Sequence, residues 1–395
     1  MWSVYDMEKR ILDFIANETN GKCYQSFRYC SDDEILMPTL DYEEKGGEFS
    51  LVKNSYGETD TSLKTTKCIK ETAKKIINDN PLFHFFLDGS RRTYKVDDME
   101  INKNVYPIIA GQIGVACCQR QSPDKFKNAE FERKLVLSLP KAANPNAGDA
   151  KLFFNSLTSK VNKLSTLEKR GVQFDKILSY DSKKQDDGTK YEHLGIATIQ
   201  DEMIETEKKI VASLYDKGLI NPDKYLIKDG SLQYTPMGKG DFKELIKYKN
   251  HYKCVVGISK SPNFTLCQDK DGKSNADKIA EMPLFHRTPV YKYRNERVGE
   301  VCFAIWYLRI RAKKYSASPF SGILKIEKIL ITDDEIENGL ESQEVDLITA
   351  SIVNERNPVC YGKDDRWANH LYPIYLTETF IKSKYLSDIN FLNIF

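Results

Sequence analysis

Short apolar runs separated by polar turns recur along this chain from residue 82 onwards. Runs of this length, rich in β-branched and aromatic residues, are typical of buried strands. The strands they predict lie at 82–87, 95–101, 105–118, 134–139, 173–180, 225–228, 254–258, 301–310 and 323–331. The first two are expected to pair as a hairpin. Several strands in direct succession predict an antiparallel meander that opens the domain.

Helical spacing of apolar residues is clearest between residues 199 and 217. Ile199, Met203, Ile210 and Leu214 recur at intervals that place them on one face of a helix. Shorter or less regular patterns predict helices at 8–15, 65–78, 333–353 and 372–386, the last one starting around a proline. Strands, then a helix, then further strands predict an α+β or α/β domain around a mixed sheet.

The first 80 residues differ in character from the rest. They are mixed and polar, and residues 41–62 are rich in Gly, Glu and Ser, which predicts a loop or an irregular hairpin. We therefore expect residues 1–80 to form an N-terminal elaboration and residues 81–395 to form the main domain.

Composition limits the function classes without naming one. The chain has 395 residues, 41% of them apolar and 29% charged, and a net charge of +2. This balance excludes a polycationic nucleic-acid binder, so any binding surface for nucleic acid must be local. No apolar run approaches the roughly 20 residues that span a bilayer. Nine scattered cysteines without a Cys-x-x-Cys pair argue against a disulfide framework and predict a reduced, cytoplasmic protein with no membrane contact.

The tripeptide Asp-Gly-Ser occurs twice, each time directly after a predicted strand. Asp88 ends the first of these strands and Asp229 ends the other. Taken alone, an aspartate followed by glycine is usually a turn. Two such aspartates can converge, however, if their strands are neighbours in one sheet. Carboxylates held close together repel each other, and a divalent cation relieves that repulsion.

The helix between the two tripeptides carries three candidate carboxylates. Glu207 shares the apolar face of this helix, and a carboxylate there is costly unless a partner or a metal satisfies it. Glu202 and Glu205 are expected to face solvent near the helix start, where negative charge is favourable. Asp88, Glu207 and Asp229 would then form a cluster suited to Mg²⁺ or Mn²⁺.

Basic residues follow several of these strands. Lys260 lies just past the strand at 254–258, where it could reach a phosphate or could equally be an ordinary solvated lysine. Arg91 and Arg92 follow the first Asp-Gly-Ser and could hold a nucleic-acid backbone or simply belong to a hairpin surface. The five histidines show no metal-ligand spacing, and the chain has no P-loop, nucleophile elbow or dinucleotide fingerprint.

Taken in order, these motifs resemble the NurA nuclease family. The resemblance lies in the segments 87–90, 228–232 and 256–260, the helix with an inward glutamate, and a late Tyr-Pro followed by a helix at 372–376. It extends over about residues 80 to 395. It implies an α/β fold with an RNase H-like (PIWI-like) mixed-sheet core, helices packed on that core, and N- and C-terminal elaborations.

The resemblance also implies roles for single residues. Asp88 and Asp229 would be metal ligands, Lys260 a phosphate or active-site contact, and Tyr372 the family's C-terminal tyrosine. The family's helical glutamate corresponds best to Glu207, with Glu202 and Glu205 as alternatives. The family usually has a histidine eight residues after the tyrosine, where this chain has Phe380, and His370 could take its place in space.

The resulting hypothesis is a DNA nuclease that uses two Mg²⁺ or Mn²⁺ ions, one to activate water and one to stabilise the leaving 3′ oxygen. By the resemblance, it would act as a homodimer on a hexameric HerA-type ATPase, in DNA repair or antiviral defence. Two alternatives stay open: a catalytically silent RNase H-like subunit that binds nucleic acid or scaffolds such a complex, and an RNase of the same fold.

Overall fold

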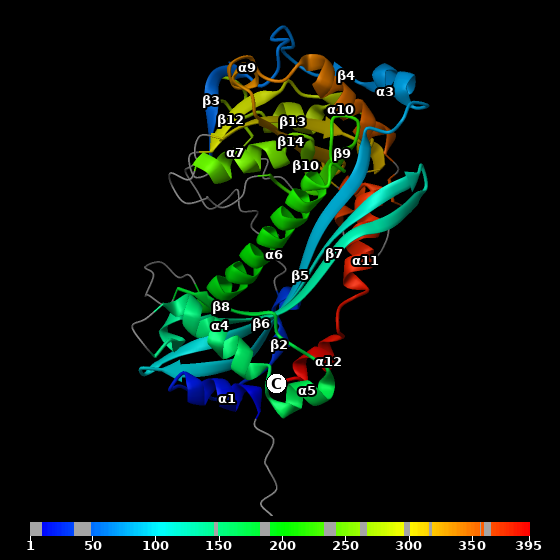
Figure 1. The fold of residues 1–395 in the computed structure, drawn as a ribbon. Helices are drawn as coiled ribbons and strands as arrows, with labels where there is room; N and C mark the ends of the chain where they lie inside the picture. The colour runs from blue at the N-terminus through cyan, green and yellow to red at the C-terminus, as the bar shows by residue number, and fades with distance from the viewer. Residues whose placement is uncertain are drawn as a thin grey trace, which may run out of the picture.

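The structure is a computed structural model, and it describes residues 10–34, 49–145, 149–181, 190–232, 242–260, 267–295, 301–315, 318–355, 357–358 and 365–395. These residues form a mixed α/β fold around one large sheet (Figure 1). The strands of its central path run in the order β3-β12-β13-β14-β10-β9-β5-β6-β7-β8.

The middle of this sheet combines a meander with two parallel strands. β5 (Phe83–Ile101), β6 (Asn104–Ser122) and β7 (Lys125–Pro140) pair antiparallel in succession. β9 (Tyr225–Asp229) then pairs parallel to β5, and β10 (Val255–Ser259) pairs parallel to β9. The antiparallel meander is therefore confirmed. The strand order β7-β6-β5-β9-β10 places β9 beside the N-terminal part of β5, so that Leu87 pairs with Lys228.

The predicted hairpin between residues 82–87 and 95–101 is wrong. Both segments belong to β5, a single strand of 19 residues that pairs with β6 along its whole length. The polar residues between them are not a turn, because they lie in the same antiparallel ladder, which shifts register only between Lys95 and Asp97.

The remaining strands extend the sheet on both sides. β14 (Ile323–Leu330) pairs antiparallel to β10, and β13 (Val301–Arg309), β12 (Tyr291–Asn295) and β3 (Phe49–Tyr56) follow. β8 (Lys176–Tyr180) pairs parallel to β7 at the other edge. The short strands β1 (Lys22–Cys23) and β2 (Tyr29–Cys30) pair with β5, whereas β4 (Lys67–Cys68) pairs with β11 (His286–Arg287).

The N-terminal segment contributes strands to this sheet. β3 lies within residues 41–62, the stretch expected to be a loop or an irregular hairpin, and pairs with β12; residues 41–48 lie outside the described part. α1 (Ile11–Glu18) overlaps the predicted helix at 8–15, and α3 (Lys70–Ile76) is shorter than the helix predicted at 65–78. The boundary at residue 80 stays a prediction.

Helix α6 (Tyr191–Asp216) crosses one face of the meander (Figure 1). It begins eight residues earlier than its apolar spacing indicates, so Glu202 and Glu205 lie in its middle and not near its start. Ile199, Met203 and Ile210 are buried against β5 and β6, as the spacing predicts.

The C-terminal third supplies the helices of the other face. The helix predicted at 333–353 is two helices, α9 (Asp333–Asn338) and α10 (Ser342–Asn354), because Gly339 adopts a φ of +85° between them. α11 (Tyr372–Lys382) starts with Pro373 as expected but ends before residue 386, and it packs on β5 and β6. α12 (Asp388–Leu392) follows.

Five further helices complete the described part of the chain. They are α2 (Ser31–Glu34), α4 (Ala150–Val161), α5 (Ser165–Arg170), α7 (Phe242–His251) and α8 (Ala276–Glu281). None of the described helices is long and apolar enough to cross a membrane.

The interior divides into two main hydrophobic clusters that share the meander. One includes Phe83–Leu87 of β5 together with β9, β10, β13 and β14. The other includes Tyr94–Ile101 of β5 together with α1, α4 and the C-terminal residues. Asp88 lies on β5 between these two clusters.

Candidate active site

The two aspartates of the repeated tripeptide lie next to each other. Leu87 pairs with Lys228 in the parallel ladder of β5 and β9, so Asp88 and Asp229 are the next residues of adjacent strands. Neighbouring strands are about 4.8 Å apart, and residues at equal register share a face. β9 ends at Asp229, and Gly230, with a φ of +88°, turns the chain away. The sheet therefore holds Asp229, at the end of β9, beside Asp88, which lies inside β5 and not at the strand end that the sequence predicts.

Side-chain alternation assigns these residues to the two faces of the sheet. A Cβ atom on Gly89 would lie 2.3 Å from Glu207 Oε1, so Gly89 faces α6. Gly114, which pairs with Ser90, faces Ile381 of α11. Asp88 has the same parity as Ser90 and therefore points toward α11, and Asp229 follows it by register.

Four side chains gather around Asp229 on the α11 face. Lys260 Nζ lies 2.8 Å from Asp229 Oδ2 and 2.7 Å from His370 Nε2. Glu378 Oε2 lies 3.0 Å from His370 Nε2 and 3.7 Å from Lys260 Nζ. The other oxygen of Glu378 binds Lys382, 2.6 Å away. We call Asp88, Asp229, Lys260, His370 and Glu378 the strand-end cluster.

Asp88 is the most constrained member of the strand-end cluster. Its side chain is buried, and its Oδ2 has no hydrogen-bond partner among the described residues. Burial, followed by the nearby charge of Asp229, raises the pKa of Asp88 well above its usual value. The fold thus holds the Asp88 carboxylate where nearby positive charges and hydrogen bonds do not offset the cost of burying its charged form.

For Lys260 and Glu378, neighbouring charges outweigh the effect of burial on the pKa. Burial lowers the pKa of Lys260, but the carboxylates of Asp229, Asp88 and Glu378 outweigh burial and raise it overall. Burial raises the pKa of Glu378, but the bond from His370 and the charges of Lys260 and Lys382 outweigh burial and lower it overall. Both groups are therefore held in their charged forms.

Glu207 lies on the other face of the sheet. It is buried on α6, as expected, and its Oε2 is 3.1 Å from Lys228 Nζ, without the alignment of a hydrogen bond. Lys228 Nζ also donates to the backbone oxygen of Asp229 at 2.7 Å. Burial raises the pKa of Glu207 although Lys228 opposes this. Because Gly89 has no side chain, the Glu207 carboxylate comes close to the β5 backbone beside Asp88.

The strand-end cluster has the donor chemistry of a hard-cation site. Asp88, Asp229 and Glu378 offer only oxygen, which Mg²⁺ and Mn²⁺ prefer, and three carboxylates face one buried lysine. The described side chains nevertheless include no set of three His, Cys, Asp or Glu residues already grouped as a metal site. On this face, the Lys260 ammonium lies against Asp229 and Glu378. Their oxygen donors suit a divalent cation, which would compete with that ammonium for the same oxygens.

The alternative glutamates of α6 have partners of their own. Glu202 is buried and lies 3.0 Å from Lys134 Nζ and 2.7 Å from Lys176 Nζ, so the expectation that it faces solvent is wrong. Glu205 is exposed and pairs with Lys208 one turn along α6, as expected. Neither glutamate contacts the strand-end cluster in the described structure.

Arg91 and Arg92 pair with carboxylates of this chain. Arg91 Nη1 lies 2.8 Å from Asp32 Oδ1, and its Nε donates to Gln200 at 2.6 Å. Arg92 Nη2 lies 2.8 Å from Asp388 Oδ2. A nucleic-acid phosphate would have to compete with these partners, and the predicted backbone contacts of both arginines stay predictions.

Tyr372, Phe380 and His370, the C-terminal positions singled out by the family resemblance, differ in whether they contact the strand-end cluster. Tyr372 opens α11, and its ring centroid lies 6.4 Å from that of Tyr375, which in turn packs edge-on against His370 at 6.2 Å. Phe380 packs against Phe131, 5.2 Å between centroids. His370 is thus the histidine that reaches Lys260 and Glu378.

Glu378 is the site residue that sequence reasoning missed. It follows Thr377 and precedes Ile381 on the buried face of α11. An acidic residue at helical spacing from apolar ones was the pattern that singled out Glu207, and it applies equally to Glu378.

A buried glutamate also holds the turn after Asp229. Glu327 of β14 accepts from Ser231 Oγ at 2.9 Å and from the Leu232 backbone N–H at 2.8 Å, and Lys325 pairs with its other oxygen at 2.8 Å. These bonds fix where β9 ends and therefore where the Asp229 carboxylate points.

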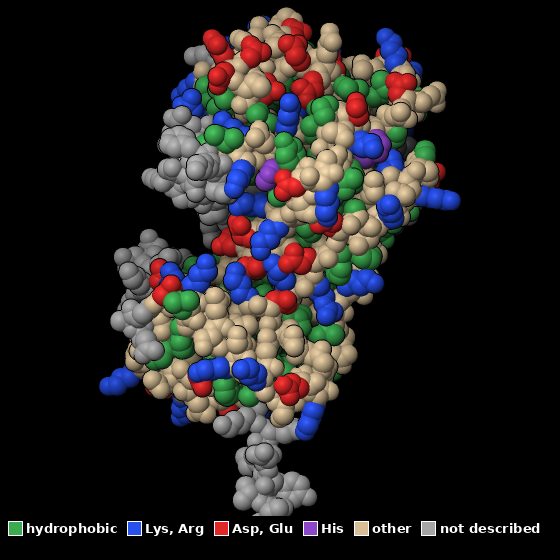
Figure 2. Space-filling model, in the orientation of Figure 1, with side chains coloured by type: hydrophobic (Ala, Val, Ile, Leu, Met, Phe, Trp, Pro, Cys, Tyr) green, Lys and Arg blue, Asp and Glu red, His purple; other side chains and the backbone are tan. Residues whose placement is uncertain are grey.

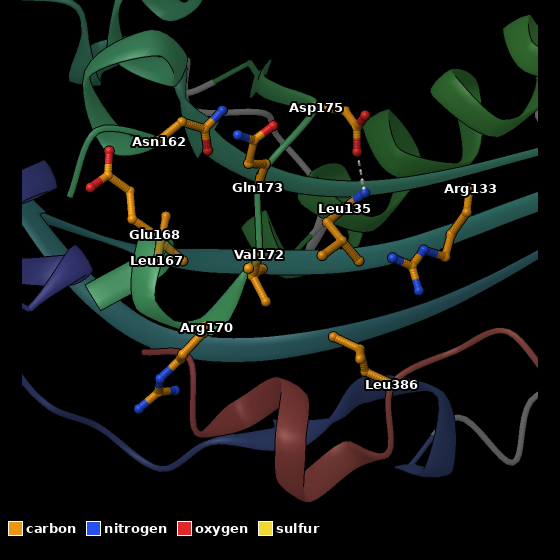
Figure 3. A pocket seen from close by; sticks show the side chains of 11 residues that line it. Arg133, Leu135, Asn162, Leu167, Glu168, Arg170, Val172, Gln173, Asp175 and Leu386 are labelled. Carbon is orange, nitrogen blue, oxygen red and sulfur yellow. Dashed lines mark hydrogen bonds between the residues drawn. The ribbon is translucent and has the colours of Figure 1, made fainter. Parts of the chain in front are cut away.

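A pocket of about 600 Å³ lies elsewhere, lined by residues of β7, of α5 and its flanks, and by Leu386 (Figure 3). Three of its polar side chains are bonded within the fold: Asp175 accepts from the Leu135 backbone N–H, Arg133 donates to Lys384 O, and Arg170 donates to Asn393 O. None of the predicted site residues lines it, so it is not the candidate site.

Comparison with known proteins identifies similarity at the level of solved structures. No family model matches this chain, and no curated protein matches it. Among solved structures, the crystal structure of the NurA nuclease from Sulfolobus solfataricus is similar over 82% of this chain and 88% of that chain, with 10% sequence identity and a TM-score of 0.39. Values this low do not establish a shared family, so function has to be argued from the residues.

Proposed function

We propose that this protein is a metal-dependent nuclease that hydrolyses DNA phosphodiester bonds at the strand-end cluster. One observation carries the proposal. Asp88 of β5 and Asp229 at the end of β9 lie side by side, with Lys260 against Asp229, and a buried oxygen of Asp88 has no hydrogen-bond partner among the residues that the structure describes. A soluble fold keeps such an arrangement at a cost in stability, and perturbed carboxylates of this kind are typical of functional sites.

The strand order supports an RNase H-like core. A three-stranded meander, a helix on its face, and two parallel strands added beside the first strand give the order β7-β6-β5-β9-β10. In this order the site carboxylates come from the first strand, from the helix and from the end of the fourth strand. The motif resemblance to the NurA family assigns its acidic residues to the same three elements.

Each residue then has a chemical role. Asp88 and Asp229 would hold Mg²⁺ or Mn²⁺, with Glu207 approaching through the gap at Gly89 and Glu378 from α11. Bound ions would supply an activated water and stabilise the leaving oxygen. Lys260 would contact the scissile phosphate as a point charge. His370 would orient Lys260 and Glu378, and Tyr372 would stand at the substrate side of α11.

Partner proteins are part of the proposal. The face in Figure 2 shows Lys and Arg side chains interspersed with Asp and Glu, and no continuous basic field. With a net charge of only +2, the chain would gain much of its grip on DNA from a partner. We propose a homodimer that docks on a HerA-type hexameric ATPase, in DNA repair or antiviral defence.

Cleavage of end-labelled linear DNA tests the proposal. Single- and double-stranded DNA, and an RNA of the same sequence, are incubated with Mn²⁺ or EDTA, with and without the ATPase. We expect Mn²⁺-dependent DNA cleavage that Asp88→Asn and Asp229→Asn each reduce by at least about 100-fold. Glu205→Gln, an exposed carboxylate of α6, is the matched control and should keep full activity.

The second candidate is a silent nucleic-acid-binding subunit. It is favoured by Phe380, which packs against Phe131 where the family has its histidine. Absence of cleavage under every condition, partner included, together with DNA binding that survives Asp88→Asn, would replace the nuclease by this candidate. Cleavage of RNA alone would make the protein an RNase of the same fold.

A further inference from the structure

The Lys260 ammonium lies between the carboxylates of the strand-end cluster, next to Asp229 and Glu378. Its ammonium is 2.8 Å from Asp229 Oδ2 and 3.7 Å from Glu378 Oε2, and only 10% of its side chain is exposed. Glu327 and the bonds it accepts fix the Asp229 turn, so the carboxylate cannot easily turn away. The lysine is a resident cation on two of the three carboxylates of this face.

A divalent ion and the Lys260 ammonium cannot both bind the same carboxylates without weakening each other's binding. Two positive charges within about 4 Å of each other repel strongly in a buried site. Asp88 Oδ2, which has no hydrogen-bond partner among the described residues, is available to an ion, whereas Asp229 Oδ2 and Glu378 Oε2 lie against Lys260. An ion that takes these two oxygens as ligands therefore has to displace the lysine.

A phosphate group is the ligand that would draw the lysine outward. Lysine is a compact charge on a flexible four-carbon stem, so its ammonium can swing by several ångströms without backbone movement. Lys260 follows the last residue of β10, at the rim of the sheet, and a phosphate placed there would exchange one anionic partner for another. The cost of leaving Asp229 would be offset by the arriving phosphate.

We propose that Lys260 couples ion binding to substrate binding. Without a phosphate, its ammonium neutralises Asp229 and Glu378 and weakens the binding of divalent ions. With a phosphate bound, Lys260 turns to that phosphate, and the two carboxylates become ligands. Ion and phosphate then bind with positive cooperativity, and each raises the affinity for the other by the same factor. This inference rests on the proposed function, because it assumes a divalent ion at the cluster.

Manganese binding measures this coupling without any cleavage. Free Mn²⁺ is followed by electron paramagnetic resonance during titration of the full-length protein, with and without saturating thymidine 5′-monophosphate, which has a phosphate but no phosphodiester bond. Wild type is expected to bind Mn²⁺ about 5-fold or more tightly when the nucleotide is present. Lys260→Met should bind Mn²⁺ more tightly than wild type without nucleotide, and should gain little from adding it.

Matched variants separate the lysine's role from general effects. Lys176→Met removes a lysine that pairs with Glu202 outside the cluster, and it should behave like wild type. Lys260→Gln removes the charge but keeps a hydrogen-bonding group, and it guards against a folding defect in Lys260→Met; thermal melting verifies that both are folded. Asp229→Asn gives the background of Mn²⁺ bound elsewhere.

The outcomes distinguish the two proposals. Wild type that binds Mn²⁺ above the Asp229→Asn background, with Lys260→Met and Lys260→Gln binding no more tightly, would overturn the coupling and leave the nuclease intact. Tight Mn²⁺ binding by the two Lys260 variants alone would support the coupling. No binding above background by any variant, with or without nucleotide, would overturn both the coupling and the metal-dependent nuclease.

Discussion

The two faces of the β5–β9 strand pair, one covered by α6 and the other by α11, differ in how their buried charges are compensated. On the α6 face, the Glu207 carboxylate meets the Lys228 ammonium, one to one. On the α11 face, the three carboxylates of Asp88, Asp229 and Glu378 lie around one buried lysine, and Asp88 Oδ2 has no hydrogen-bond partner among the described residues. Glu207 Oε2 also lacks an aligned hydrogen bond, but it has one ammonium for one carboxylate. The two faces therefore differ in the ratio of buried carboxylates to buried lysines, on backbone a few ångströms apart.

The largest loss of stability should come from removing one partner of the Glu207–Lys228 pair on the α6 face. Glu207→Ala leaves Lys228 buried without its carboxylate, and we expect a loss of about 3 kcal/mol in the free energy of unfolding. Adding Lys228→Met should recover most of this loss, because both charges are then gone. Denaturant unfolding of the two single variants and of the double variant gives the coupling.

Cleavage by the same double variant decides what Glu207 does. We expect activity to stay lost although stability returns, because Glu207 is proposed as an ion ligand. Activity that returns together with stability would show that Glu207 acts only as the partner of Lys228.

An intermediate effect is expected at Glu202, which lies on α6 like Glu207 but is balanced by Lys134 and Lys176. Glu202→Gln should lower the free energy of unfolding by about 1–2 kcal/mol, since two charge-assisted bonds weaken while Lys134 keeps Glu132. Cleavage per folded molecule should not change. A loss of cleavage at unchanged fold would place Glu202 in the chemistry and undermine the distinction between the faces.

The smallest effect, and the only gain, is expected at Asp88. Asp88→Asn removes a buried charge that the fold does not compensate, so the melting temperature without metal should rise by about 2 °C. The folded pKa of Asp88 lies above its unfolded value, so the folded state holds the extra proton and loses stability as pH rises. The gain should therefore be clear at pH 8 and absent at pH 3. Destabilisation at pH 8 would mean that Asp88 supports the fold.

The sequence predicted the parts of the site that local patterns encode. Asp229 ends β9 and Lys260 directly follows β10, as the short apolar runs indicate. Asp88 does not end a strand, because β5 continues past the first tripeptide to Ile101. Which strands are neighbours could only be assumed, because the parallel pairing of β5 with β9 joins residues about 140 positions apart. Strand adjacency is a long-range property that no local pattern contains.

The errors arise where a tertiary partner overrides a local pattern. Polar residues in the middle of β5 indicate a turn, but β6 pairs with them throughout. Glu202 has the polarity of a surface residue, but Lys134 and Lys176 reach it from β7 and β8. The orientation of Asp88 and Glu207 to opposite faces depends on the parity of β5 at Gly89, which becomes visible only with α6 and α11 in place.

The length of β5 has a mechanical consequence. This one strand carries Asp88 and is clamped at both ends, by Phe83–Leu87 in one hydrophobic cluster and by Tyr94–Ile101 in the other. A force applied to the turn between β5 and β6 would act on the strand that carries Asp88, through a ladder whose register shifts once, between Lys95 and Asp97. A partner that pulled on this turn would therefore act directly on a strand of the proposed site.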